Sequence, residues 1–313
     1  MAGEGRYLEV KWMAVGMVLL GALVVAVSSL RGDTSPAQQL AFKATRVDLV
    51  NQMGAAIARA GDAERSAVLA TTDEASQAFA EQARAGLGEV EAAMGQLGGL
   101  AGKGSPEREK EQLARFAKAF QELKKGDEEV LRLAVQNTNL KAYALAFGPA
   151  AQALSELEAP LARLVEQAAG STEGRQVVLH ALGARVAALH VQALLAPHIA
   201  EESDAAMDLM EATLRSEQDQ ARKELSALAA LPSMKASGEV AAAAAALDRY
   251  AGLEARILAL SRENTNVRSL ALTLNQERKT MAVALEALAA LKQAILEEPI
   301  PGVTYGQAPN PRR

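Results

Sequence analysis

Three histidines are the residues of this sequence whose chemistry could bind a metal or haem. His180, His190 and His198 are ten and eight residues apart, which rotates them by about −80° and +80° along a helix, so the three do not form one face. His198 and Glu201 lie one helical turn apart, but metal-binding bundles project His and Glu pairs from two helices. The pattern favours ordinary helix histidines over a metal site, with His198 and Glu201 as weak candidates, and no cofactor is expected.

The acidic stretches TTDEAS (71–76) and AEESDA (200–205) are the other groups that could act in catalysis. Carboxylates at these points also suit the first turn of a helix, where they stabilise the helix dipole by about 0.3–1 kcal/mol each. The sequence has no nucleophile motif, no glycine loop for phosphate and no Ser/His/Asp arrangement. An enzyme is therefore not expected.

The composition predicts an all-α protein. Half of the 313 residues are hydrophobic but only 3% are aromatic, and the apolar residues are mostly Ala, Leu and Val. Ala and Leu are the strongest helix formers, and they suit slim helices packed in bundles. The net charge of −5, without a basic stripe, makes nucleic acid an unexpected partner. The absence of cysteine excludes disulfides, thiolate zinc sites and covalent c-type haem.

An uncharged run of nineteen residues, Trp12–Leu30, predicts a membrane anchor. It would cover roughly 28 Å as a helix, which is about the hydrocarbon thickness of a bilayer. A cleaved signal peptide is the alternative, because Ala26-Val27-Ser28 resembles a cleavage site. With a short head and a long following domain, we expect residues 1–11 in the cytoplasm and the bulk of the chain in the periplasm of a bacterium, anchored in its inner membrane.

The tripeptide Asn-Thr-Asn occurs twice, at 137–139 and 264–266, 127 residues apart (264 − 137 = 127). Upstream, LATTDEASQAF (69–79) matches IAEESDAAMDL (199–209), and downstream ALSELEAPLARL matches ALEALAALKQAI. The sequence therefore predicts a duplication with a linker at AAGSTEG (168–174). The expected organisation is a head (1–11), an anchor (12–30), two tandem antiparallel four-helix bundles (31–169 and 170–297) and a disordered tail (298–313).

Helix start and stop signals predict four helices in each repeat. Asp73 and Ser203 mark the second helix of each repeat, with Asp73 as its cap, and a kink is expected at Gly148-Pro149. Asn137 and Asn139, with Asn264 and Asn266, are expected to reverse the chain between the third and fourth helices, because Asn tolerates left-handed dihedrals and caps free N–H groups. The alternative is one long four-helix bundle whose helices of about 60 residues run through these elements, with the Asn side chains in a buried polar layer.

Two passages resemble the four-helix-bundle sensor domains of methyl-accepting chemotaxis receptors. The passage VLRLAVQNTNLKAYALAFGPAAQALSELEAPLARL (130–164) is similar to their third-to-fourth helix passage, and ERSAVLATTDEASQAFAEQARAGLGEV (64–90) to their first turn. The resemblance implies a tandem pair of sensor domains on a membrane anchor. This sequence departs from those receptors because it carries no second apolar span, relay or methylated coiled coil after the bundles.

The resemblance implies that a small molecule binds between helices and that a separate signalling protein carries the output. Arg46, Arg59 and Arg65 lie on the helix that carries ligand-binding arginines in some of these sensors, although solvated cations on a helix face are the favoured reading. A homodimer is another expected partner. An interaction scaffold, and after it a haem or metal bundle, are the alternative functions.

Overall fold

The computed structural model describes residues 35–100, 106–168 and 172–300. These residues are almost entirely helical and contain no strand, so the predicted all-α class is confirmed. The predicted head (1–11), the anchor (12–30) and nearly all of the tail (298–313) lie outside the described residues.

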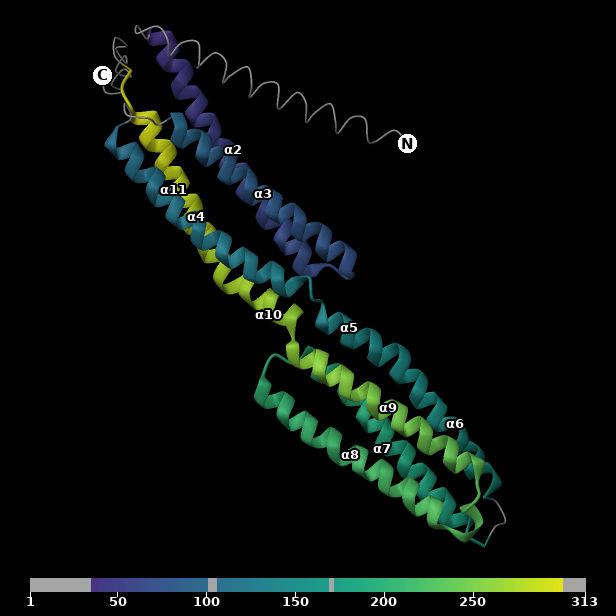
Figure 1. Cartoon of the computed structure of the whole chain (residues 1–313). Coiled ribbons are helices and arrows are strands. Elements are labelled where there is room, and N and C mark those ends of the chain that lie inside the picture. The colour runs from purple at the N-terminus through teal and green to yellow at the C-terminus, as the bar shows by residue number, and fades with distance from the viewer. Residues whose placement is uncertain (1–34, 101–105, 169–171, 301–313) are drawn as a thin grey trace, which may run out of the picture. The chain divides into compact units, whose positions relative to one another are not determined.

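The helices follow one another in a repeated order (Figure 1). The first set is α2 (Pro36–Leu69), α3 (Asp73–Leu100), α4 (Glu107–Ala134), α5 (Thr138–Leu145), the π-helix η1 (Ala146–Ala150) and α6 (Ala151–Gln167). The second set is α7 (Gly174–Ala200), α8 (Asp204–Ala230), the short 3-10 helix η2 (Pro232–Met234), α9 (Gly238–Glu263), α10 (Thr265–Leu272), the π-helix η3 (Thr273–Glu277) and α11 (Arg278–Glu297). Each repeat thus contains the four predicted helices, the fourth being divided into α5, η1 and α6 in the first repeat and into α10, η3 and α11 in the second.

The duplication is visible in the elements themselves. Helices α5 and α10, η1 and η3, and α6 and α11 all begin 127 residues apart, for example 265 − 138 = 127. The kink expected at Gly148-Pro149 is a π-helix, η1, with Pro149 inside it. Its equivalent η3 has the sequence TLNQE without proline, so proline alone does not produce the π-helix.

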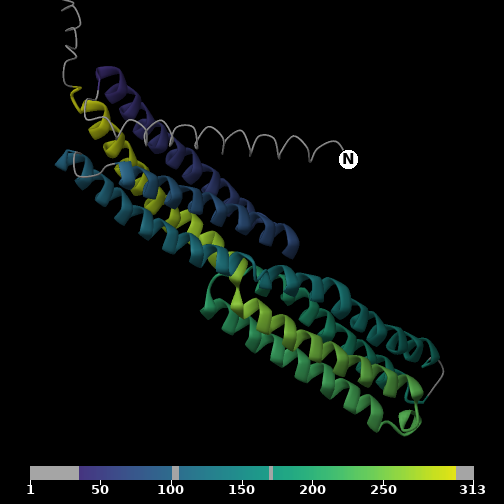
Figure 2. The same cartoon turned by 45° about the horizontal axis from the view of Figure 1, so that its top comes forward.

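The described chain forms two compact units, each made of separate segments of sequence. Of the described residues, unit 1 contains 35–63, 81–100, 106–127 and 276–300, and unit 2 contains 64–80, 128–168 and 172–275. In unit 1, the buried apolar residues come from α2, α3, α4 and α11, with Phe116 and Phe120 of α4 fully buried and stacked at 5.9 Å. In unit 2, they come from α5 and α6 together with α7, α8 and α9. The helices that form the core of each unit lie side by side in both views, α2, α3, α4 and α11 in unit 1 and α5 to α9 in unit 2 (Figure 1; Figure 2).

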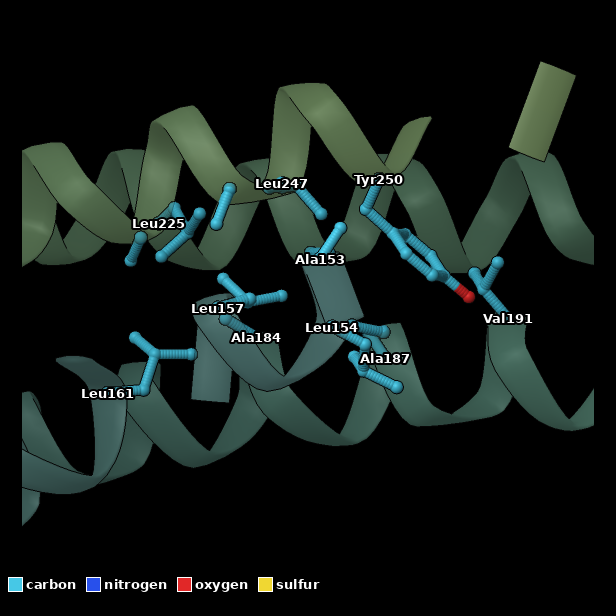
Figure 3. Close-up of a cluster of buried hydrophobic side chains, with 14 of the residues drawn as sticks. Ala153, Leu154, Leu157, Leu161, Ala184, Ala187, Val191, Leu225, Leu247 and Tyr250 are labelled. Atoms are coloured by element: carbon cyan, nitrogen blue, oxygen red, sulfur yellow. The ribbon is translucent and has the colours of Figure 1, made fainter. Parts of the chain in front are cut away.

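This division differs from the predicted tandem bundles 31–169 and 170–297. Helix α6 was expected to pack along α4, but its apolar residues Leu157 and Leu161 belong to the core of unit 2 (Figure 3). Helix α11 was expected to pack along α9, but Leu288 and Leu291 belong to the core of unit 1. Each unit therefore takes three helices from one repeat and the last helix from the other. The alternative of uninterrupted 60-residue helices is also wrong, since helices end at both Asn-Thr-Asn elements.

Small residues allow close helix packing in these units. In unit 1, a Cβ atom at Gly86 of α3 would lie 3.1 Å from the Cβ of Ala60 and 3.3 Å from the carbonyl oxygen of Ala56, both on α2. In unit 2, Ala153, Ala184 and Ala187 lie among the leucines of the core (Figure 3). The Ala-rich composition thus brings neighbouring backbones together, as expected for slim bundles.

Among the described residues, α7 is the helix that is long and apolar enough to cross a membrane. That test uses length and composition only, and core helices of soluble proteins also pass it. One face of α7 does pack in the core of unit 2, through residues such as Val177, Ala184 and Val191.

The core of unit 1 gives a direct test of the fold. Replacement Phe120→Ala, which removes a fully buried ring, should lower the free energy of unfolding by about 3–5 kcal/mol. The matched control is Phe147→Ala, because Phe147 is 60% exposed and only stacks on Tyr143 at a centroid distance of 6.0 Å. That control should cost at most about 1.5 kcal/mol. Urea unfolding measures both, and equal losses would contradict the assigned core.

Candidate functional site

The two Asn-Thr-Asn elements meet in unit 2. Each interrupts a helix at its first asparagine, since Asn137 and Asn264 both have φ of 52°. Among the described residues they are the only non-glycine positions with positive φ. Asn adopts this left-handed conformation more readily than other residues with a Cβ atom, and here it interrupts the helical path. The predicted chain reversal at these elements is wrong, because α6 and α11 do not pack back along α4 and α9 but belong to the other core.

Each element supplies the hydrogen-bond acceptors for the first turn of the other. The N–H of Thr138 donates to Thr265 Oγ1 at 3.2 Å, and the N–H of Thr265 donates to Thr138 Oγ1 at 3.1 Å. The two hydroxyl oxygens are 3.2 Å apart. One residue further, the N–H of Asn139 donates to Asn266 Oδ1 and the N–H of Asn266 donates to Asn139 Oδ1, both at 3.2 Å. The starts of α5 and α10 therefore cap each other.

The side-chain amides complete the contact. Asn139 Nδ2 donates to Asn264 Oδ1 at 2.7 Å, and Asn266 Nδ2 donates to Asn137 Oδ1 at 3.0 Å. Three of the asparagine side-chain amides also donate to groups outside the pair. Asn137 donates to Asp73 Oδ1, Asn264 to the carbonyl oxygen of Glu201, and Asn139 to the carbonyl oxygen of Ile199. The predicted role of Asn as a cap is therefore corrected, because the caps come from the opposite element rather than from the helix's own first residue.

The Asn-Thr-Asn pair, residues 137–139 with 264–266, is a buried polar contact. Asn137, Thr138, Asn139, Asn264 and Thr265 are each at most 5% exposed. Buried polar groups are costly when unpaired, and here they are satisfied by one another. A polar contact of this kind is directional, so it holds the two helix starts in one relative position.

The turn between α2 and α3 is capped by Thr72 rather than by Asp73. The N–H of Ala75 donates to Thr72 Oγ1 at 3.1 Å, while Asp73 lies in the first turn and accepts from Asn137. This hydrogen bond, helped by Lys141, lowers the pKa of the Asp73 carboxyl. In the second repeat, Ser203 caps α8 by accepting the N–H of Ala206 at 3.3 Å, as the marker position predicts.

His198 is fully buried beside the Asn-Thr-Asn pair. Its Nδ1 lies 2.8 Å from Ser261 Oγ, and its Nε2 lies 3.2 Å from Glu211 Oε1. Burial lowers the pKa of His198, against the hydrogen bond and charge of Glu211. Arg262 in turn holds Glu211 at 2.5 Å and lowers the pKa of that carboxyl.

Glu201 is not a metal partner of His198 in this arrangement. Its Oε1 accepts the N–H groups of Glu202 and Ser203 at 3.0 and 2.8 Å, so it serves the turn before α8. The other two histidines each face a carboxylate of α8, His180 with Glu224 at 2.6 Å and His190 with Glu217 at 3.3 Å. Glu211, the partner of His198, also lies on α8, so all three histidines face that helix. The expectation that they do not share a face of α7 is therefore wrong, although each ring has its own carboxylate.

The three candidate arginines lie in different surroundings. Arg46 is buried in unit 1, 2.5 Å from Glu109 Oε2 and paired also with Glu298, with Phe42 stacked at 4.8 Å. Arg59 is exposed and pairs with Glu89, and Arg65 is exposed in unit 2. The structure does not bring them together, and Arg46 is occupied by protein carboxylates.

A buried carboxylate of unit 2, Glu254 on α9, was missed by sequence analysis. Glu254 is 3% exposed, and its burial raises its pKa to about 7 even though Gln218 donates a hydrogen bond to it. One turn away, the hydroxyl of Tyr250 donates to Gln192 Oε1 at 3.0 Å, and Gln192 Nε2 donates to the carbonyl of Ala146 at 3.0 Å. The signal was available, because Glu254 falls on the apolar stripe of α9.

Comparison with known proteins assigns no relative: no protein-family model and no curated protein matches this chain.

The reciprocal caps predict energetic coupling between Thr138 and Thr265. Either Thr→Val replacement keeps the shape but leaves a buried N–H without its acceptor, which should cost about 1–3 kcal/mol of stability. The double variant should cost less than the sum, because both single variants lose the same hydroxyl–hydroxyl contact. Urea unfolding of the four proteins measures the coupling. Thr213→Val on the exposed face of α8 is the control and should change stability by at most about 0.5 kcal/mol. Strict additivity at 138 and 265 would argue against the contact.

Glu254 predicts a pH-dependent stability. Its pKa is about 7 in the folded chain against 4.5 for the unconstrained carboxyl, so folding favours the protonated form. The raised pKa of Glu254 therefore adds up to about 3 kcal/mol to the free energy of unfolding. This addition is complete below pH 4.5 and is lost as the pH rises through 7. In Glu254→Gln this component should disappear, whereas the exposed Glu166→Gln should keep it. Unfolding measured from pH 4.5 to pH 8 gives the answer, and equal slopes for wild type and Glu254→Gln would refute the assignment.

Proposed function

We propose that this chain is a membrane-anchored, sensor-like module of a bacterial signal-transduction system. Trp12–Leu30 tethers it to the inner membrane, and its helical units lie in the periplasm. There it binds a small ligand or a signalling partner, and a separate protein carries the output. The support is the resemblance of its repeats to chemoreceptor sensor domains, together with its helical-bundle fold.

The observation that carries this proposal is the Asn-Thr-Asn pair. It joins the starts of α3, α5 and α10 to the end of α7 through Asp73 and the carbonyls of Ile199 and Glu201. Left-handed residues and π-helices are concentrated at functional sites and switch regions, and here each left-handed asparagine is followed within nine residues by a π-helix. A ligand that shifts one of these helices would change hydrogen bonds in the others.

An interaction scaffold is the second candidate. It is favoured by the apolar side chains on the outer face of α7, Leu179, Leu182, Val186 and Leu189, which are 39–65% exposed. A haem or metal bundle is not favoured, because both ring nitrogens of His198 are within hydrogen-bond distance of protein partners.

A ligand screen on the full chain in detergent micelles tests the sensor proposal. A small molecule at 100 times its Kd should stabilise the protein by about 2.7 kcal/mol, seen as a rise in melting temperature. Hydrogen exchange with that molecule bound should also change at 137–139 and at 264–266 together. A compound that does not shift melting is the control. No stabilising compound in a broad panel of small metabolites, or a binder that leaves both elements unchanged, would favour the scaffold.

A further inference from the structure

The start of α2 and the end of α11 form an apolar groove on the surface of unit 1. The groove has a volume of about 540 Å³, and its lining includes Ala37, Leu40, Ala44 and Val47 of α2, Leu296 of α11, and Ile300 beyond the end of α11. Leu40 and Leu296 are 58% and 47% exposed. Large apolar side chains that line one groove are stabilised when another apolar group covers them. The α2–α11 groove, defined by these six residues, is therefore a surface on which an apolar segment can dock.

The chain beyond α11 stays at this groove. Lys43 Nζ donates to two carbonyl oxygens around the end of α11, at 2.6 and 2.7 Å, and Arg46 pairs with the carboxylate of Glu298. Two residues later, Ile300 is 7% exposed and lines the groove. Residues 298–300, which were expected in the disordered tail, are thus held against α2. The residues that follow them therefore start at the groove.

The residues that follow Ile300 have the apolar side chains and the reach to fill this groove. They read PGVTYG (301–306), in which Val303 and Tyr305 are the large apolar side chains. In an extended segment, two residues separated by one other present their side chains on the same face. Five residues span at most about 18 Å, and the α2 side of the groove is about 15 Å long at the standard helical rise. Both side chains can therefore reach the groove lining.

We propose that Val303 and Tyr305 occupy the α2–α11 groove, so that the C-terminal segment forms a strap across the start of α2. The strap is attached to the groove through Ile300, and short tethers give effective concentrations on the order of millimolar. Even a weak apolar contact is therefore populated, whereas a second copy of the chain or an apolar molecule from solution lacks this advantage. Docking covers Leu40 and Leu296 and fastens the end of α11 to the start of α2.

The absence of cysteine from the chain allows the strap to be tested by cross-linking. The double variant Ala37→Cys/Tyr305→Cys in the full chain, in lipid nanodiscs, should form an intramolecular disulfide on mild oxidation, detected by mass spectrometry of the digested protein. The matched control is Gln38→Cys/Tyr305→Cys, because Gln38 is also exposed but points about 100° away from Ala37 around α2. Linkage at position 37 should be at least about tenfold faster than at position 38, since docking raises the local concentration of the partner thiol.

Adding Val303→Asp to each pair should remove the preference for position 37, because a carboxylate is costly in an apolar groove. Thermal melts by circular dichroism check that the variants fold. Equal rates at positions 37 and 38 would overturn the proposal, as would a preference that survives Val303→Asp. Linkage mainly between two chains would assign the groove to a second copy and would also overturn it. None of these readouts depends on a small ligand, so the strap and the proposed sensing function can fail independently of each other.

Discussion

The reciprocal capping of α5 and α10 is the interaction on which the arrangement of unit 2 depends. A helix start leaves N–H groups without intrahelical acceptors, and a first residue in the left-handed conformation does not place its own side chain to accept them. Here Thr138 and Thr265 each accept the N–H of the other, and Asn139 and Asn266 do the same one residue later. Neither helix start is satisfied alone. Duplication of one short sequence thus produced two elements that complete each other across a local twofold relation.

The same duplication explains which parts of the fold could be predicted. Helix ends depend on nearby residues such as Asp73, Ser203 and the asparagines, so the sequence indicated where helices begin and end. Which helices pack together could not be predicted in this way, because α6 and α11 are equivalent in the two repeats and carry similar apolar stripes. Either could complete either core on pattern alone. The structure places Leu157 in unit 2 and Leu288 in unit 1, a choice made by packing between distant segments that no local signal records.

The candidate site shows the same limit. The repeated tripeptide singled out the right residues, but the local rule that an Asn caps its own helix gave the wrong acceptor. Arg46 was a candidate ligand-binding cation, with a solvated cation as the favoured interpretation. Instead it is buried inside unit 1 and paired with Glu109 and Glu298, which lie 63 and 252 residues away in sequence. Glu254 could have been found, since a charged residue on an apolar helical stripe is a departure from binary patterning. The hydrogen bond that Gln218 donates to Glu254 could not have been found, because it joins side chains of two different helices, α8 and α9.

An Ala- and Leu-rich core also explains why polar contacts matter so much in this chain. Small, similar side chains allow close approach of helices, but they discriminate poorly between one register and another, whereas a hydrogen-bonded polar group in the core accepts few alternatives. The chain places such groups at two levels of unit 2, the Asn-Thr-Asn pair and the Glu254–Gln218 contact. Both are satisfied only in the observed register. A shift of α9 and the following α10 by one turn would therefore break buried hydrogen bonds at both levels.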